Sequence, residues 1–575
     1  MSNRAPEIHL LRDILMLVLL GGLVVIPSMA TRELWSPDEP RYVEVAREMI
    51  ARSDYLVPHL NGEAYAEKPP LFFWLAAAFY RCGCGYNAGR VVAGLAAIGT
   101  VLLVYFFARR HWPSPAPLLA GLAMLMSLLF LSHARLGVLD PLFAFLTTAA
   151  ILAGHRALHS QRGSGAAAGW WLAFYGTVGL AVLTKGHVGL FVPGVVVLAY
   201  ALLNRRQVWG GGHWHAFGAV LLLVIVGAWL VPAGIVGGKS YLYNLTVRQL
   251  VGRVIPSAGG HRLQIHPQPF YHYALQYLWF AFPWTLLFPL AATEAAVAWR
   301  QRHNEAALFA LFWFIAVCVL FSIPAGKRAG YLLPLAPAMG LLMGHYLGVG
   351  TVEGWRFPRI HRHLLLATFF LAALVLLILT ATAFTSVWTP DVVVRFVPQY
   401  APLVAEVRGE MGMLMRLFGI VAALTLAVVA IAGAWVLLRT RRALLSLICL
   451  AAVLFGVSLY ADIFVLAPIS RARSERRLCE AAALDLAEAD ALYTLDPSLA
   501  GVYNLYTRRI SIPVIGNHLA AALEEPRRVV VIGSEDNFRR FAPAALERYR
   551  VVARLQIRPE AKVVLANWNR DTPGP

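Results

Sequence analysis

Two adjacent carboxyl groups, Asp38 and Glu39, lie just after an apolar run that is long enough to enter a membrane, and Arg41 follows them closely. A carboxylate can accept a proton, orient a nucleophile or stabilise positive charge that develops in a transition state. The same polar segment continues to a second cluster, "YAEKPP", which contains Tyr65, Glu67 and Lys68. Charges of both signs beside a membrane indicate a polar site, and the segment 32–87 is its first candidate location.

Further ionisable residues recur beside other apolar runs. They are Arg135 and Asp140 in "RLGVLDP", Lys185 in "LTKGH", Lys327 and Arg328 in "GKRAGYLLP", and Lys239, Arg248, Arg253 and Arg262 in the segment 238–270. Each would cost free energy if it faced lipid, so a row of charges at one membrane interface favours a polar cavity. The alternative is that long side chains reach the interface from lipid-facing positions. That alternative suits Lys and Arg but explains Asp38, Glu67 and Asp140 poorly.

The elements that must position these residues are mostly membrane-spanning helices. Of the 575 residues, 59% are hydrophobic and 14% are charged, against roughly 25% charged residues in soluble domains. A spanning helix needs about 20 apolar residues. Thirteen runs are predicted to span: 11–31, 88–108, 114–132, 138–157, 166–184, 187–204, 215–237, 271–299, 304–324, 329–350, 363–388, 414–438 and 443–466. The run 69–80 is too short to span and is predicted to be re-entrant or interfacial.

The basic residues predict the orientation of the chain. The formal net charge is +19, but Lys and Arg occur in short clusters between alternate apolar runs rather than in one block, which argues against nucleic-acid binding. Such clusters mark the cytoplasmic side of a membrane protein. We therefore expect a cytoplasmic amino terminus, a first run that is retained as a span, and an external carboxyl-terminal segment.

Two external segments are predicted to have structure of their own. Residues 40–52 alternate apolar and charged side chains at helical spacing, which suits a helix along the membrane surface, and Asp38 could cap its first turn. Residues 468–575 carry no apolar run and predict a small α/β domain beside a membrane domain of residues 1–467. Its expected strands are "ALYTL", "RRVVVIG", "YRVVARLQI" and "AKVVLAN", and its expected helices are "GNHLAAALEE" and "EDNFRRFAPAALERY".

The segment "SPDEPRYVEVAREMI…DYLVPHLNGEAYAEKPPLFFWL" resembles the first external loop of membrane glycosyltransferases that use polyprenyl-phosphate sugars, and of the lipid A aminoarabinose transferases in particular. "RLGVLDP", "LTKG", "FPWTLLFP" and "GKRAGYLLPLAPA" continue the resemblance in order. The sequence departs from the family pattern at His187, where Pro is common. The resemblance is weak after the membrane part. The resemblance implies a polytopic α-helical protein with the C-type glycosyltransferase fold, related to protein O-mannosyltransferases, in the bacterial inner membrane. It would have about 13 transmembrane helices and a small periplasmic α/β domain.

The resemblance also implies a reaction: transfer of 4-amino-4-deoxy-L-arabinose from undecaprenyl phosphate to a lipid A phosphate, which gives resistance to polymyxin. For this reaction the candidate catalytic residues are Asp38, Glu39, Lys68 and Asp140. The candidate substrate-binding residues are Arg41, Tyr42, Tyr65, Glu67, Lys185, Arg253, Lys327 and Tyr331. The Asp-Glu pair is the catalytic motif of the family, whereas Lys68, Arg41 and Arg253 are chosen because cations stabilise a departing phosphate.

The sequence requires no cofactor, although Glu67 with His59, His261 or His266 could hold a divalent ion. We expect a monomer that binds two lipids and no nucleic acid. The nearest alternative is the same fold with a protein hydroxyl as acceptor, in which case Asp38 would accept the proton. A lipid transporter is disfavoured because no internal repeat is evident and the charges gather at one interface rather than at the midplane. A channel or ligand sensor has no supporting motif.

Overall fold

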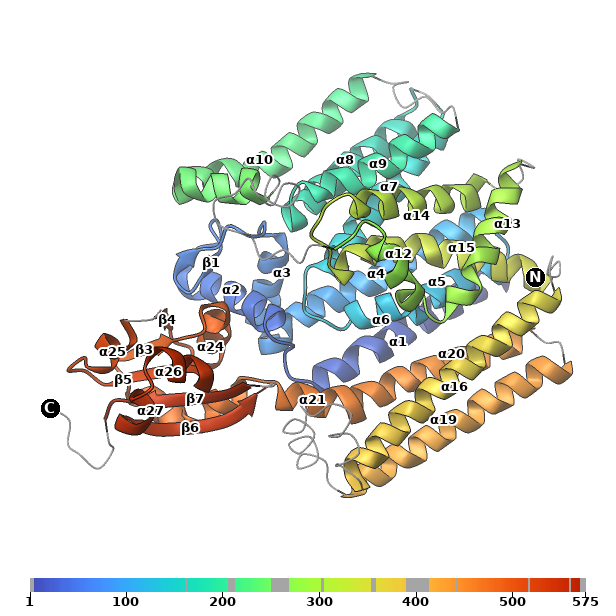
Figure 1. Ribbon diagram of the computed structural model, residues 1–575. Helices are drawn as coiled ribbons and strands as arrows, with labels where there is room; N and C mark the ends of the chain where they lie inside the picture. Colours follow the sequence, from blue (N-terminus) through green and yellow to red (C-terminus); the bar gives the residue numbers. More distant parts are fainter. Residues whose placement is uncertain are drawn as a thin grey trace.

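The computed structural model describes residues 5–161, 163–204, 212–249, 268–300, 305–352, 358–388, 413–440, 443–514, 518–557 and 560–568. Most of the chain forms a bundle of helices that run side by side, with a small α/β domain at one end (Figure 1). The bundle contains α1 (Ala5–Thr31), α4 (Ala88–His111), α7 (Asp140–His159), α8 (Gly165–Lys185), α9 (Val188–Leu203), α10 (Gly212–Tyr243), α14 (Glu305–Ser322), α15 (Ala336–Val352), α16 (Pro358–Trp388), α19 (Met413–Thr440) and α20 (Ala443–Tyr460).

The apolar runs form helices because, in lipid, only a helix or a closed barrel pairs every backbone amide and carbonyl group. Within the described ranges, nine helices are long and apolar enough to cross a membrane, and three further apolar helices have 10–17 residues. The shorter ones fall in the predicted runs 114–132, 187–204 and 271–299, and α16 covers the run 363–388. The chain is therefore a multi-pass membrane protein.

Two of the predicted spans are broken at positions that meet in space. The run 114–132 divides at Ser127 into α5 (Ala116–Met126) and α6 (Leu128–His133), and the run 271–299 divides into α12 (His272–Phe280) and α13 (Phe288–Arg300). The backbone N–H of Leu128 donates to the carbonyl of Phe282 at 2.9 Å, and the Trp284 indole donates to the carbonyl of Ala123 at 2.7 Å. Each break thus gains hydrogen bonds from the other.

The first external segment folds into α2 (Asp38–Arg52), a hairpin of β1 (His59–Leu60) and β2 (Glu63–Ala64), and α3 (Leu71–Phe79). Asn61 and Gly62 link the two strands, and both have positive φ angles, 59° and 79°, as the tight hairpin turn requires. At nine residues α3 is too short to cross a membrane alone, as predicted, and it continues through a bend at Gly83 into α4. Helix α2 forms as predicted and packs against α3 and against the α/β domain, while its place along the membrane surface stays a prediction.

The carboxyl-terminal α/β domain contains a five-stranded sheet in the order β4-β3-β5-β7-β6. Its strands are β3 (Ala491–Thr494), β4 (Ile512–Pro513), β5 (Val529–Ser534), β6 (Arg550–Ile557) and β7 (Glu560–Ala566), of which β3 is parallel to β4 and β5. Its helices are α22 (Arg476–Ala481), α23 (Ala483–Glu488), α24 (Ala500–Thr507), α25 (His518–Leu523), α26 (Glu535–Phe541) and α27 (Ala545–Arg548), and α21 (Ala467–Ala472) leads into them from α20. Alternate strand residues enter two apolar cores, one on each face of the sheet.

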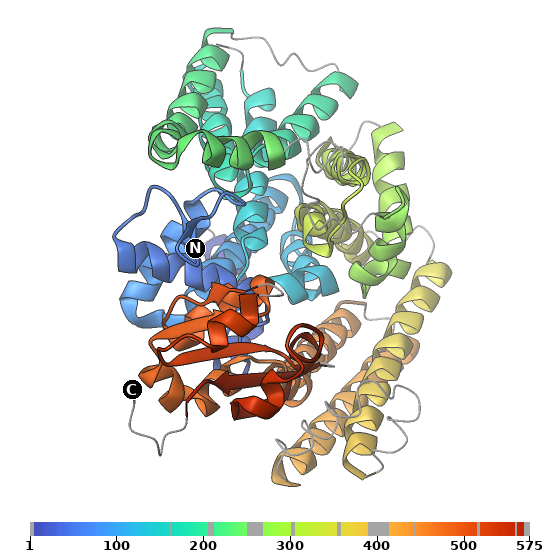
Figure 2. The same cartoon turned by 60° about the vertical axis from the view of Figure 1, so that its left-hand side comes forward.

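Four of these strands match segments that the sequence predicted, and β4 is the exception. The predicted helix 535–549 is two helices, α26 and α27. The boundary expected at residue 468 stays a prediction. Figure 2 shows the α/β domain against the amino-terminal segment that contains α2, so the carboxyl-terminal domain and the first external segment lie at the same end of the bundle.

Candidate active site

A cavity of about 850 Å³ lies beside α2, the helix that packs against the α/β domain. It is lined by residues from α2, the segment 67–69, the turn before α7, the turn between α8 and α9, the middle of α10 with the helical turn after that helix, and the segment 321–331. Its charged lining residues are Asp38, Arg41, Glu67, Lys68, Asp140, Lys185, Arg248, Lys327 and Arg328. The predicted convergence of ionisable residues from separate hairpins is confirmed.

Asp38 is the first residue of α2, and its carboxylate faces the cavity rather than capping the helix. Pro37 occupies the cap position and no side chain caps the first turn, so the capping role predicted for Asp38 is wrong. Instead, Nη2 of Arg41 donates to Oδ1 of Asp38 at 2.5 Å, one helical turn away. Nη1 of the same guanidinium lies 3.9 Å from Oε2 of Glu67. Arg41 therefore joins two carboxylates that line the cavity.

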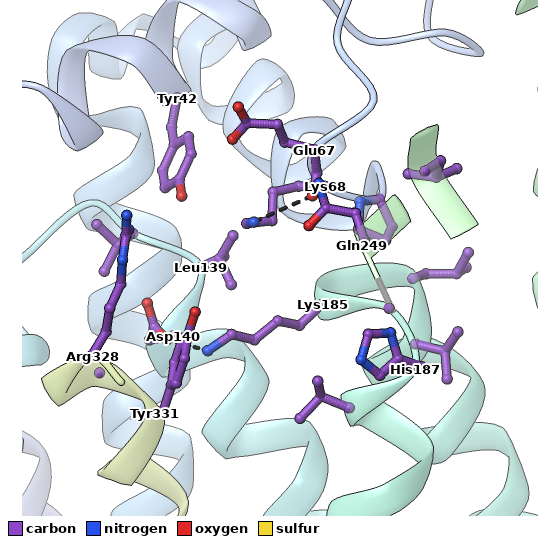
Figure 3. A pocket seen from close by; sticks show the side chains of 18 of the residues that line it. Tyr42, Glu67, Lys68, Leu139, Asp140, Lys185, His187, Gln249, Arg328 and Tyr331 are labelled. Carbon is purple, nitrogen blue, oxygen red and sulfur yellow. Dashed lines mark hydrogen bonds and ion pairs between the residues drawn. The ribbon is translucent and has the colours of Figure 1, made fainter. Parts of the chain in front are cut away.

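The electrostatic surroundings keep Arg41 charged and Tyr42 neutral. Burial by itself would lower the pKa of Arg41, but Tyr65, Tyr42 and the two carboxylates raise it above its ordinary value. Burial raises the pKa of Tyr42, so its phenol keeps its proton near neutral pH. The ring of Tyr42 lies under the Arg41 guanidinium at 5.4 Å and lines the cavity beside it (Figure 3).

Glu39 does not reach the cavity, although it was predicted to be catalytic. Its side chain is 1% exposed and accepts from Nε and Nη2 of Arg90 at 2.8 and 2.9 Å, and from the backbone N–H groups of Gly137 and Trp35, both at 2.6 Å. Burial acts to raise the pKa of Glu39, but Arg90 and these hydrogen bonds outweigh it and the pKa is lowered. Glu39 is an anchor that fixes the start of α2.

Arg90, on α4, completes that anchor, and the sequence analysis did not select it. Its Nη1 donates to the carbonyls of Ser28 and Arg32 at 2.9 and 2.8 Å, and its Nη2 also donates to the carbonyl of Glu33 at 2.8 Å. With the two bonds to Glu39, all five N–H groups of the guanidinium have acceptors. The end of α1, the start of α2 and the turn before α7 are therefore held around one buried ion pair. The available signal was a charge, Arg90, at the start of a predicted span.

Lys68 extends into the cavity, while Tyr65 stays behind it. Nζ of Lys68 donates to the carbonyl of Glu67 at 3.2 Å and points into the space between α2 and the start of α7 (Figure 3). The phenol of Tyr65 donates to Oε2 of Glu67 at 3.3 Å, and its ring packs on Phe73 in the core. Tyr65 was predicted to bind substrate, but it is buried and does not line the cavity. It supports Glu67 instead.

A second ion pair lies across the cavity from α2. Asp140, the first residue of α7, accepts a hydrogen bond from Nζ of Lys185, the last residue of α8. The same amine lies 4.6 Å from the centre of the Tyr331 ring, so Lys185 is held between a carboxylate and an aromatic face (Figure 3). Its side chain is only 8% exposed, and that of Asp140 is 19% exposed. Asp140, Lys185 and Tyr331 thus form one unit of the predicted site.

The remaining predicted cations divide into three groups. Lys327 lines the cavity, but its Nζ donates to the carbonyls of Pro324 and Gln268 at 2.7 and 3.2 Å. Arg248 and Arg328 also line it, and they were noted in the sequence without being chosen. Arg253 lies outside the described residues, and its role stays a prediction. Lining residues that the sequence analysis missed altogether include His133 and Gln249.

A divalent ion was expected to be possible at Glu67. Among the described residues, no three His, Cys, Asp or Glu side chains gather where they could hold a metal. Two of the three histidines named for that ion, His261 and His266, lie outside the described ranges. A metal site here therefore stays an expectation.

Comparisons with known proteins find similar sequences and one similar fold. Residues 11–236 match the family of dolichyl-phosphate-mannose-protein mannosyltransferases. An undecaprenyl phosphate-alpha-4-amino-4-deoxy-L-arabinose arabinosyl transferase of Edwardsiella ictaluri is 32% identical over 349 residues, which are 60% of this chain and 61% of that protein. The corresponding transferase 1 of Pseudomonas fluorescens is 28% identical over 341 residues, which are 58% of this chain and 59% of that protein. The chain thus matches about three fifths of the length of these relatives.

One solved structure matches nearly the whole chain. The crystal structure of ArnT from Cupriavidus metallidurans bound to undecaprenyl phosphate superposes with a TM-score of 0.77 and 23% identity, over 97% of this chain and 98% of that one. The chain therefore has the C-type membrane glycosyltransferase fold, with the α/β domain included in the match. The fold predicted from the sequence is confirmed.

Proposed function

We propose that this protein transfers 4-amino-4-deoxy-L-arabinose from undecaprenyl phosphate to a lipid A phosphate at the periplasmic face of the bacterial inner membrane. The observation that carries the proposal is the single cavity in which carboxylates and cations from six separate segments meet. The names of the similar arabinosyl transferases supply the sugar and its carrier. The alternation of basic loops along the sequence supports a cytoplasmic amino terminus and a periplasmic site.

The charge balance of this reaction suits the residues present. An oxygen of the acceptor phosphate forms a bond to C1 of the sugar while the bond from C1 to the donor phosphate breaks, and the electron pair stays on the departing undecaprenyl phosphate. The donor changes from a phosphodiester with one negative charge to a monoester with nearly two, and the acceptor changes in the opposite sense. No proton has to leave the acceptor, so the site needs cations more than it needs a strong base.

The cavity provides those cations in fixed positions. Lys68 and Arg248 line it from two separate segments and can stabilise the negative charge that grows on the departing phosphate. Positive charge grows on the sugar at the same time, by analogy with glycoside cleavage, and a carboxylate beside it lowers the barrier. Asp38, held by Arg41, is the carboxylate we assign to this role. The sugar amine is a cation, and Glu67 or Asp140 can receive it.

The test is transfer by the purified protein from undecaprenyl-phosphate aminoarabinose to lipid A, read by mass spectrometry. We expect the unmodified protein to add the sugar and Asp38→Ala and Lys68→Ala to lose at least about 100-fold in rate. Glu63→Gln, an exposed change in β2 of the same external segment, serves as the matched control and should leave the rate unaltered. Absence of transfer by the unmodified protein would overturn the function, and full activity of Asp38→Ala would overturn its role.

A second acceptor is supported by one observation, the match of residues 11–236 to protein mannosyltransferases. A protein hydroxyl would have to lose its proton on attack, and Asp38 is a carboxylate in the cavity lining that could take it. Offering the same donor with serine- and threonine-containing peptides in place of lipid A separates the two acceptors. Glycosylated peptide without modified lipid A would establish this alternative.

A further inference from the structure

The α/β domain touches the helix that carries Asp38 and Arg41. Helix α24 packs along α2 and is the part of the domain in closest association with it. Leu505 of α24 is fully buried with Val43 of α2 and Leu34, and the rings of Tyr506 and Tyr86 meet at 5.8 Å beside them. At the edge of this contact, Nη1 of Arg476 lies 3.3 Å from Oε1 of Glu33.

The two sides of α2 have different partners. Arg41 and Val43 are two residues apart, so they point to opposite sides of a helix with 3.6 residues per turn. Arg41 lies at the cavity, and Val43 lies against Leu505 of the α/β domain. The helix is thus clamped between the site and the domain, and a movement of the domain would carry Arg41 and its partner Asp38 with it.

A second contact reaches the far end of α2 through the hairpin. The carboxylate of Glu48 accepts from the backbone N–H groups of Asn61 and Gly62 at 2.7 and 3.1 Å. The Asn61 side chain in turn accepts from Nδ2 of Asn504 on α24 at 2.7 Å. Helix α24 approaches the hairpin so closely that a Cβ at Gly501 of α24 would lie 2.7 Å from Cδ1 of Leu60 in β1. The hairpin turn therefore ties α2 to the domain.

We propose that the α/β domain is a positioning element of the active site, in which Asn504 and Leu505 on α24 hold α2 and so fix Asp38 and Arg41 at the cavity. The membrane part holds the start of α2 through Glu39 and Arg90 and packs on one side of the helix through α3. Helix α24 holds another side of α2 through Leu505, and it holds the end of α2 through the hairpin. Reacting groups that are misplaced by about 1 Å can lose about 100-fold in rate, so this contact bears on turnover. The effect on turnover rests on the proposed function, but the hold on α2 does not.

The hydrogen bond between Asn504 and Asn61 allows a test that leaves each partner folded. Oδ1 of Asn504 also accepts from the N–H and the hydroxyl of Ser511, both at 2.7 Å, inside the domain. Asn504→Asp keeps those two bonds, and Asn61 can turn its amide to donate to the new carboxylate. Asn61→Asp keeps its acceptor for the Asn504 amide. Only the double variant places two carboxylates against each other, so it alone breaks the contact.

Hydrogen exchange of the full-length protein in detergent, without substrate, measures the hold on α2. We expect exchange in Asp38–Arg52 to be faster in the double variant than in either single variant, with β5 and β7 unchanged. With donor and lipid A, the fold-losses in kcat of the two single variants would multiply if the two residues acted independently. We expect kcat of the double variant to lie about tenfold below that multiplied value, and KM to change by less than about twofold. Equal exchange in α2 for all three variants, or exchange that rises throughout β5 and β7, would overturn the proposal.

A second pair of variants keeps the proposal falsifiable if the double variant does not accumulate. Leu505→Met conserves volume against Val43 and should leave exchange in α2 and kcat near those of the unmodified protein. Leu505→Ala opens the contact and should raise exchange in α2 and lower kcat. Identical behaviour of the two would contradict the positioning role. Failure of the unmodified protein to transfer the sugar would overturn the proposed function and leave the exchange result standing.

Discussion

The Asp140 carboxylate depends on a neighbour that has no side chain. A Cβ at Gly330 would lie 3.1 Å from both Cγ and Oδ1 of Asp140, closer than ordinary van der Waals contact. Any larger residue at position 330 must therefore push the carboxylate away from Lys185 or shift the turn that carries Tyr331. The Asp140–Lys185–Tyr331 unit is thus sensitive to a single methyl group.

We predict that Gly330→Ala lowers the rate of sugar transfer about tenfold while the protein still folds, because it displaces Asp140 without removing it. Transfer kinetics and thermal unfolding in detergent measure the two effects. Gly194→Ala is the matched control, since a Cβ there meets nothing within 4 Å and alanine favours the helix α9. An unchanged rate for Gly330→Ala would show that the position of Asp140 does not limit the reaction.

At this scale the sequence identified which residue types would gather, but it did not separate Asp38 from Glu39. Both residues follow the first span and both are acidic. Only the positions of Arg90 and Gly137 in the fold show that the Glu39 carboxylate is buried in an ion pair and a hydrogen bond with them. Those partners are 51 and 98 residues away in sequence. Tyr65 was misplaced for a similar reason, since its ring enters a core formed by α3.

At the scale of elements, α2 carries a buried acidic group on a surface that the sequence marks as polar. Glu44 is fully buried, and both oxygens accept from Arg47 at 2.7 Å. Burial raises the pKa of Glu44 from its ordinary 4.5 to about 7, because the ion pair with Arg47 offsets only part of the desolvation. The folded protein therefore binds this proton more tightly than the unfolded chain does.

We predict that the free energy of unfolding falls, through Glu44, as the pH rises from about 4.5 to about 7, because the folded state must release a proton that the unfolded state has already lost. Across this pH range, the free energy of unfolding of Glu44→Gln should fall by about 1–3 kcal/mol less than that of the unmodified protein. Melting temperatures of both proteins across this pH range measure it. Glu39 acts in the opposite sense, since its lowered pKa gives stability that is lost as the pH falls below its ordinary value. Parallel melting curves for the two proteins would contradict the prediction.

The sequence predicted most elements because hydrophobic run length and β-branched content are local signals. It did not predict the breaks in the runs 114–132 and 271–299, because each break is stabilised by hydrogen bonds from the other, between Leu128 and Phe282 and between Trp284 and Ala123. Such a pairing joins residues more than a hundred positions apart, and either run alone reads as an uninterrupted span.

At the scale of the whole molecule, the helix that carries Asp38 and Arg41 is held by segments from both ends of the chain. The first external segment contributes α2, and the last helices lead into the domain that covers α2. The sequence placed both on the same side of the membrane by counting spans and basic loops, but no local pattern showed that they touch. The contact depends on single groups such as Asn504 and Leu505, which have no distinctive neighbours in the sequence.

A buried carboxylate near the carboxyl-terminal end of the bundle joins these two parts. Asp462, in the helical turn between α20 and α21, is 1% exposed. Its Oδ2 lies 2.6 Å from Nη1 of Arg135, and its Oδ1 lies 3.3 Å from Nη1 of Arg32. Arg32 follows α1 and Arg135 precedes the turn that leads to Asp140. One carboxylate therefore links the entry to α2, the approach to α7 and the connection to the α/β domain.

We predict that Asp462→Asn destabilises the protein by about 3–5 kcal/mol, because it leaves two buried guanidinium groups facing each other without an anion between them. Thermal unfolding in detergent should show a lower melting temperature, and hydrogen exchange should rise at the end of α1 and in the segment 134–139 together. Asp536→Asn, an exposed change on α26, should alter neither measurement, since surface charges contribute little. If Asp462→Asn and Asp536→Asn melted at the same temperature, the two arginines would have to be neutralised by another group, and Asp462 would not be the link between the two ends of the chain.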